Sequence, residues 1–374
     1  MKNDSKSGIR RDILIYEEPQ PDGIRLRCVL LETGKPAEML EKTTSVAADS
    51  SEMNNSWREQ DIILAQVTRI VPSLAAAFVD IGEDHEGMLP LKLAPEGIKP
   101  GQPVIVQIRR STAEGKGSQL TARPQLPGFF AVCRPFEARP LKRSKLNFAD
   151  ENKKEELFQN ELSNLEQEWL NILQSAELGG SLPRLLARFQ DPLMQALRDW
   201  TGHGLRQIQI EGLELFEQVD RILSEHAPDW RSLLRLQPED SDYSLVDIFR
   251  LGDLDKQLNN RTMLLKNGGK IVWDQTEALL AIDVNSGKAV RGRDPQKIWL
   301  ETNMQAAEEI ARLLRLRRFQ GLAVIDLIRL KSVQDRSLLS QHLEQQFSYD
   351  SARLQTGGFT KLGLYELTRS LKKL

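Results

Sequence analysis

Two aspartates that end apolar runs are the residues of this sequence best suited to chemistry. Asp283 closes the run Leu279–Ile282, and Asp326 closes the run Leu322–Ile325. A carboxylate inside an apolar run is unfavourable unless it is paired or bound to a metal. If the two runs are neighbouring parallel strands, both carboxylates emerge at one edge of the sheet and form a site for a hard cation such as Mg²⁺. Asn285 shares the face of Asp283 and can orient a ligand or an attacking water molecule.

A simpler role is open to each aspartate, in which it caps a turn or pairs with an arginine. The strand pattern by itself does not decide between that role and a metal site. The basic residues near this edge also have two possible roles, either contacting phosphate groups or lying on a solvated helix face. We expect the loop residues Lys288, Arg291 and Arg293 to contact phosphate groups. The arginines of the following helix fit a solvated face better, with pairs such as Glu308–Arg312.

The elements that must position the aspartates form a strand–helix–strand unit. The predicted elements are, in chain order, a hairpin of Lys270–Trp273 and Ala278–Val284, a long amphipathic helix Pro295–Arg317, a buried strand Gly321–Leu330, a helix Arg336–Phe347 and a final strand or helix Leu362–Thr368. Because a helix crosses over between the two aspartate strands, we expect these strands to pair in parallel.

The earlier region of the chain predicts a small barrel among other strands and helices. Five short apolar-rich runs broken by Gly, Pro and Asp suggest the barrel: Ile62–Ile70, Ala75–Ile81, Gly87–Leu91, Val104–Arg109 and Ser118–Ala122. The other predicted elements are strands Asp12–Tyr16 and Arg25–Glu32, a polar loop Thr43–Ser56, a helix Asn152–Ala176, one or two helices in Leu182–Thr201, a strand Arg206–Ile210, and helices Leu213–His226 and Val246–Leu251.

Composition sets the class of protein. The chain has 374 residues, 40% of them hydrophobic and 28% charged, as in ordinary globular proteins of more than one domain. Its net charge of −2 means that any nucleic-acid contact must come from local basic patches. The two cysteines, Cys28 and Cys133, have no metal-ligand spacing. Without a signal-peptide core or a membrane-length apolar run, we expect a cytoplasmic protein that does not engage a membrane.

Several of these motifs resemble one known family. The runs Ala281–Gly287, Glu301–Arg317 and Gly321–Asp326 look like the catalytic core of the bacterial ribonuclease E/G family. Thr68–Gly82 with Glu86–Lys92 is similar to that family's inserted OB-fold RNA-binding domain. The resemblance runs from about Arg11 to the C-terminus and is closest to a short form of the family, like ribonuclease G or the catalytic half of ribonuclease E.

The resemblance implies a multidomain fold of the α/β class (α+β in its domain organisation). It consists of an RNase H-like domain that is discontinuous in the chain, an inserted OB-fold barrel and a DNase I-like catalytic subdomain. The implied segments are 1–58 (the first segment of the RNase H-like domain), 59–124 (OB-fold RNA-binding domain), 125–190 (a reduced helical region resembling a 5′-end sensor), 191–262 (the second segment of the RNase H-like domain) and 263–374 (DNase I-like catalytic domain).

The resemblance also implies a function. The chain would be a Mg²⁺-dependent endoribonuclease that hydrolyses single-stranded RNA to 5′-phosphate and 3′-hydroxyl ends, in rRNA processing or mRNA decay. Asp283 and Asp326 would hold Mg²⁺, with Mn²⁺ as an alternative, and Asn285 would lie near the attacking water. The alternative function is a catalytically weak or inactive RNA-binding protein on the same scaffold. A nuclease that acts on DNA is a third reading.

Further contacts with RNA follow from the same resemblance. Phe78 matches an aromatic residue that stacks on RNA, and Lys116 matches a basic contact; burial of Phe78 in the barrel core and a solvated turn at Lys116 are the alternatives. Arg353 falls where the family has a basic residue near the active site.

The sequence departs from the family pattern at several places. Met88 replaces the second stacking aromatic, and Arg329 replaces an acidic residue after the second metal ligand. The segment Pro127–Lys154 is too short for the family's 5′-monophosphate sensor, so we expect 5′-end sensing to be lost or built differently, with Arg139–Lys145 as a charged loop. The family's Cys-x-x-Cys zinc link between protomers is not found in this sequence, so we expect no zinc-bridged dimer. An oligomer formed in another way is still compatible with the sequence.

Overall fold

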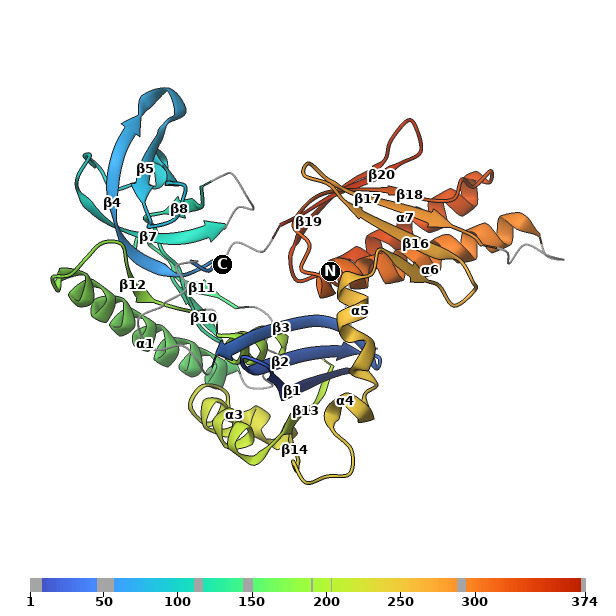
Figure 1. Ribbon diagram of the computed structural model, residues 1–374, viewed down its shortest axis with the longest axis horizontal. Helices are drawn as coiled ribbons and strands as arrows, with labels where there is room; N and C mark the ends of the chain where they lie inside the picture. Colours follow the sequence, from blue (N-terminus) through green and yellow to red (C-terminus); the bar gives the residue numbers. More distant parts are fainter. Residues whose placement is uncertain are drawn as a thin grey trace. The chain divides into compact units, whose positions relative to one another are not determined.

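The computed structural model describes residues 9–45, 57–110, 117–143, 151–189, 191–202, 204–287 and 294–370 (Figure 1). The chain divides into two compact units. Unit 1 consists of Met1–Leu14, Val29–Met39 and Gln237–Lys373, and unit 2 of Ile15–Cys28, Leu40–Leu236 and Leu374. The finer division into five segments stays a prediction. Among the described helices, none is long and apolar enough to cross a membrane, and the cytoplasmic location also stays a prediction.

Unit 1 contains a six-stranded sheet with the order β15-β16-β17-β18-β20-β19. Its strands are β15 (Thr262–Leu264), β16 (Lys270–Gln275), β17 (Leu280–Asn285), β18 (Gly321–Asp326), β19 (Arg353–Phe359) and β20 (Tyr365–Ser370). The pair β17–β18 is parallel, and the other neighbours are antiparallel. The predicted hairpin and the predicted parallel pair are therefore confirmed.

Two long helices cover one face of this sheet. Helix α6 (Pro295–Leu316) joins β17 to β18, and helix α7 (Val333–Ser348) joins β18 to β19. The helices pack against each other on the same side of the strands (Figure 1). Side chains at alternate positions of β17 and β18 are buried on this side, among them Ile282 and Ile325, whereas those between them face outward. Helix α6 begins where the Asp294 side chain accepts a hydrogen bond from the Gln296 amide.

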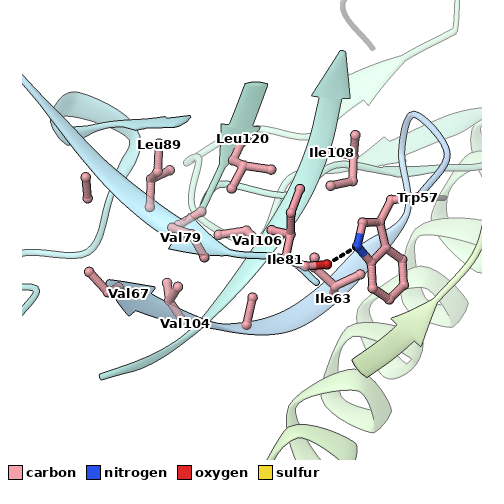
Figure 2. Close-up of a cluster of buried hydrophobic side chains, with 13 residues drawn as sticks. Trp57, Ile63, Val67, Val79, Ile81, Leu89, Val104, Val106, Ile108 and Leu120 are labelled. Carbon is pink, nitrogen blue, oxygen red and sulfur yellow. Dashed lines mark hydrogen bonds between the residues drawn. The ribbon is translucent and has the colours of Figure 1, made fainter. Parts of the chain in front are cut away.

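Unit 2 contains the predicted barrel. Its strands are β4 (Ile62–Val71), β5 (Ala76–Asp80), β6 (Gly87–Pro90), β7 (Pro103–Arg110) and β8 (Gln119–Thr121). The order β4-β5-β6-β8-β7 closes on itself through the pair β4–β7. Figure 2 shows the apolar cluster that fills it, with Trp57 at one end donating a hydrogen bond of 2.5 Å to the Ile81 carbonyl. A closed five-stranded barrel of this kind fits an OB-fold-like domain.

A second, five-stranded sheet has the order β14-β13-β1-β2-β3. Its strands are β1 (Arg11–Gln20), β2 (Gly23–Glu32), β3 (Lys35–Ser45), β13 (Leu205–Glu211) and β14 (Leu234–Gln237). The helices near these strands in the chain are α2 (Pro192–Trp200), α3 (Leu213–His226), α4 (Leu245–Ile248) and α5 (Leu254–Asn259). Short 3-10 helices are Pro72–Leu74, Leu91–Leu93, Pro228–Leu233 and Leu251–Asp253. In the chain, the barrel strands lie between β3 and β13.

The segment after the barrel combines a small sheet with a long helix. The sheet consists of β9 (Leu126–Pro127), β10 (Ala131–Cys133) and β11 (Leu141–Lys142), and the helix is α1 (Glu151–Glu177). Helix α1 confirms the predicted helix, whereas the three short strands were not predicted.

Two sequence predictions of the fold require correction. The stretch Leu182–Thr201 is helical only at α2, because its first half forms β12 (Arg184–Ala187), which pairs with β4. The predicted loop Thr43–Ser56 begins inside β3, and its residues 46–56 lie outside the described residues. The last predicted element, left open between strand and helix, is the strand β20, and its partner β19 was not predicted.

Candidate functional site

Asp283 and Asp326 lie side by side. They are register partners in the parallel pair β17–β18, so they come from neighbouring strands about 4.8 Å apart. Both are exposed on the face of the sheet opposite the helices. The predicted meeting of the two carboxylates is therefore confirmed. The sequence argument that burial in an apolar run would make these carboxylates need a metal is not confirmed, because neither side chain is buried. Two like charges on neighbouring strands instead repel each other, which favours a bound cation.

Asn285 acts on this pair through Asp283. Its side-chain amide Nδ2 donates a hydrogen bond of 2.5 Å to Oδ2 of Asp283. The two residues are one strand repeat apart, so both point to the exposed face. This bond fixes the orientation of the Asp283 carboxylate, as an outer partner of a metal ligand does.

The donor set fits Mg²⁺ or Mn²⁺. Among the described residues, no group of three or more His, Cys, Asp and Glu side chains is arranged to hold a metal. Magnesium does not require such a group, because it is commonly held by one or two carboxylates and completes its octahedron with water and phosphate oxygens. Asp283 and Asp326 supply two hard oxygen donors on an open surface, where a phosphate can approach.

Further charged residues share this surface, among them Lys270 and Glu366, which sequence reasoning missed. Lys270 on β16 is the register partner of Asn285, and Glu366 on β20 is the register partner of Val324. Both are exposed, and cross-strand partners share a face. We call the exposed surface of β16, β17, β18 and β20 the open face. The register of the predicted hairpin would have indicated Lys270, because Lys270–Trp273 already belonged to it.

Arg353 is not brought to the aspartates. It begins β19 and pairs with Ser370, while Gly321 at the start of β18 pairs with Arg369. Arg353 is therefore at the opposite end of the sheet from Asp326, six residues or about 20 Å along the strand. The basic residue of this hairpin at the aspartate end is Lys361, in the exposed turn between β19 and β20.

The arginines of α6 have structural partners, but not the predicted solvated pairs. Arg312 forms an ion pair with Glu309 rather than Glu308, and it donates to the Pro36 carbonyl. Arg315 is buried and pairs with Glu32 at 2.5 Å. Burial raises the pKa of Glu32, but the hydrogen bond and charge of Arg315 outweigh this and leave that pKa lowered. These arginines therefore stabilise unit 1. The predicted phosphate contacts Lys288, Arg291 and Arg293, and the barrel residue Lys116, lie outside the described residues.

Phe78 lies on the outside of the barrel, so burial in the barrel core is excluded. It is partly exposed on β5, and its cross-strand partners are Arg69 on β4 and Met88 on β6. The Arg69 guanidinium lies 4.0 Å above the ring centroid and is held by Glu86 through bonds of 2.8 and 3.1 Å. The Thr68 hydroxyl and Arg69 lower the pKa of Glu86. Ring and guanidinium are thus stacked on the outside of the barrel, with Met88 on the neighbouring strand.

The short segment after the barrel contains a carboxylate held by backbone amides. Glu161 on α1 accepts hydrogen bonds from the amides of Phe129, Phe130 and Ala131, at 2.6, 2.6 and 2.8 Å. Gly128 lies against it, since a Cβ there would be 2.4 Å from the Glu161 carboxyl carbon. Three successive amides form an anion-binding concavity, and here the protein fills it with its own side chain.

Comparison with known proteins gives consistent matches. Residues 148–372 match the model of the Ribonuclease E/G family. Ribonuclease E of Escherichia coli is 30% identical over 368 residues, covering 86% of this chain and 34% of that protein. Ribonuclease E of Haemophilus influenzae is 29% identical over 367 residues, covering 86% and 39%. Ribonuclease G of Haemophilus influenzae is 28% identical over 360 residues, covering 83% and 72%. The chain thus spans between a third and two fifths of these two ribonuclease E proteins.

Proposed function

Because this chain belongs to the Ribonuclease E/G family, we propose that it is an endoribonuclease that cuts single-stranded RNA, in rRNA processing or mRNA decay. The observation that carries the proposal is the register pairing of Asp283 with Asp326 on an exposed sheet face. A single aspartate at a strand end has many structural uses. Two on adjacent parallel strands, with Asn285 orienting one of them, fit a metal-assisted attack on a phosphodiester.

The same proposal assigns the regions of the fold. The five-stranded sheet would be an RNase H-like domain, and the barrel an OB-fold insertion in it, since the barrel strands lie between β3 and β13 in the chain. The six-stranded sheet with α6 and α7 would be the DNase I-like catalytic subdomain. This assignment puts both aspartates and Asn285 in one subdomain.

In the proposed reaction Asp283 and Asp326 would hold Mg²⁺ on the open face. The metal would supply a water molecule of lowered pKa and positive charge to offset that of the phosphate. Asn285 keeps the Asp283 carboxylate in one orientation, so that ligand does not have to reorganise when RNA binds. Water attack that displaces the 3′-oxygen leaves a 5′-phosphate and a 3′-hydroxyl.

The barrel would hold the substrate. Bases of single-stranded RNA stack on aromatic and guanidinium planes without regard to sequence, and the Phe78–Arg69 pair offers both. We further propose that cutting does not depend on a 5′-monophosphate. The support is that the amides of residues 129–131 already hold Glu161 and are not available to a phosphate.

The test replaces each aspartate by its isosteric amide. Asp283→Asn and Asp326→Asn should each lower cleavage of a 5′-labelled AU-rich RNA by at least about a hundredfold, or about 2.7 kcal/mol of barrier. Each should also lose the rise in melting temperature that Mg²⁺ gives the wild-type protein. Asp274→Asn is the matched control, because Asp274 is on β16 and pairs with Arg261. Undiminished cutting by both variants would exclude the proposed site.

The second candidate function is RNA binding without cleavage. Two observations favour it: Arg329 is exposed soon after the second aspartate strand, and Met88 is the cross-strand partner of Phe78. It predicts that RNA binds and stays intact at every Mg²⁺ concentration. Matched RNA and DNA oligonucleotides separate both functions from a DNA nuclease, because discrimination requires a contact to the 2′-hydroxyl.

A further inference from the structure

We propose that Lys270 holds a phosphate of the RNA backbone beside Asp283 and Asp326, as a positioning residue of the reaction. This inference rests on the proposed function and deepens it. Lys270 pairs with Asn285 across β16–β17, in the row of side chains next to the row that contains Asp283 and Asp326. Diagonal neighbours of this kind have backbones about 7–8 Å apart, a distance that a lysine side chain spans.

The side chain of Lys270 points to the open face. On β16, Ile271 and Trp273 are buried toward the helices, so Lys270 emerges on the other side. Among the described residues of β16, β17, β18 and β20 there are two basic side chains. The other, Arg369, is buried and pairs with Asp350. Lys270 is therefore the cation that these four strands present beside the carboxylates.

The turn before Lys270 is anchored to α6. The Asn267 side chain donates a 2.7 Å hydrogen bond to the Thr302 hydroxyl and accepts one of 3.0 Å from the Gly269 amide. The Asn267 amide donates to the Gln305 side chain at 3.2 Å. Gly269 leaves no room for a side chain, since a Cβ there would be 2.8 Å from Thr302. The backbone of Lys270 is thus fixed to the helix that follows Asp283, as a positioning residue requires.

The charge of the open face creates the need for this residue. Asp283, Asp326 and Glu366 all present carboxylates there, and a phosphate that approaches the metal site is repelled by them. Asp274 on the same strand already pairs with Arg261. A lysine suits the task, because it brings a compact charge on a flexible stem to one phosphate oxygen without imposing a fixed geometry.

The experiment compares Lys270→Gln with Lys256→Gln, an exposed lysine of α5 that pairs with Asp253. Affinity for a fluorescent single-stranded RNA is measured in EDTA between about 50 and 200 mM salt. Loss of one phosphate contact should make the slope of log K against log salt shallower by about 0.7. The weakening should be the same for AU-rich and GC-rich RNA, since a phosphate contact carries no sequence information.

Cleavage gives the second measurement. With Mg²⁺, Lys270→Gln should lower kcat/KM about tenfold, and Lys270→Arg should recover most of it, because either cation can hold a phosphate. If the wild-type chain binds and cuts RNA but Lys270→Gln matches Lys256→Gln in slope and in kcat/KM, the role of Lys270 is overturned and the proposed function stands. If the wild-type chain neither binds nor cuts RNA, both are overturned.

Discussion

The substitution Glu161→Gln tests how α1 is attached to the small sheet of unit 2. Oε1 of Glu161 accepts from the Phe129 amide, and Oε2 accepts from the amides of Phe130 and Ala131. Glutamine can keep its oxygen at the site of two bonds, which places its NH2 group against the third amide. One buried donor left unsatisfied costs about 1–3 kcal/mol. The two remaining bonds lose their ionic assistance, so we expect a total loss of about 2–4 kcal/mol.

Hydrogen exchange measures this loss where it occurs, which matters because a chain of two units does not guarantee two-state unfolding. A local loss of about 2–4 kcal/mol should speed exchange in residues 129–131 by about 10¹–10³-fold. The Phe129 amide should exchange fastest, since it faces the glutamine NH2 group. Glu168→Gln is the control, because Glu168 is an exposed residue of the same helix. Unchanged protection in Glu161→Gln would refute the claim that this carboxylate holds the amides.

Two other predictions follow from contacts in unit 2. Burial raises the pKa of Asp199, but Arg198 and Arg143 outweigh it and lower that pKa from 3.8 to about 2. The ionised form therefore stabilises the fold above pH 4, and roughly 2 kcal/mol should be lost as the pH falls from about 4 to about 2; acid unfolding followed by fluorescence should lack this step in Asp199→Asn. In the barrel, Phe78→Ala should weaken binding of single-stranded RNA by about 1–3 kcal/mol, because a base would lose its stacking partner. An unchanged affinity would show that RNA does not stack on Phe78.

Much of the fold could be predicted because its signals are local. All five barrel strands, α3 and α6 follow from alternating or helical apolar spacing within a few residues. Strand β19 was missed because most of its side chains are exposed and it contains Gly357 and Gly358, so it shows no alternation. Strand β12 was missed because its four half-buried residues resemble the start of a helix, and its partner β4 is more than a hundred residues away.

For the candidate site, too, the part that depends on local signals could be predicted and the part that depends on strand register could not. Two similar strand ends joined by one helix were enough to bring Asp283 and Asp326 together, because the parallel crossover leaves few alternatives. Lys270 and Arg353 depend instead on the register of antiparallel pairs. That register is set by contacts along the whole sheet, and a change of one residue moves a side chain to the other face. The observed register places Arg353 away from the aspartates and Lys270 next to them.

The exposed position of the aspartates changes the physical argument for a metal. Burial cannot require a cation here, since both carboxylates are exposed. Like charges on neighbouring strands destabilise a sheet by up to about 1 kcal/mol, and the alternating pattern offers no reason to place them together in a purely structural role. Asn285 stabilises the arrangement without adding a third negative charge, because it donates to Asp283 instead of repelling it. A divalent cation held by both carboxylates would offset this repulsion. The stability gained from Mg²⁺ should therefore depend on both aspartates together, and each single asparagine variant should lose most of it.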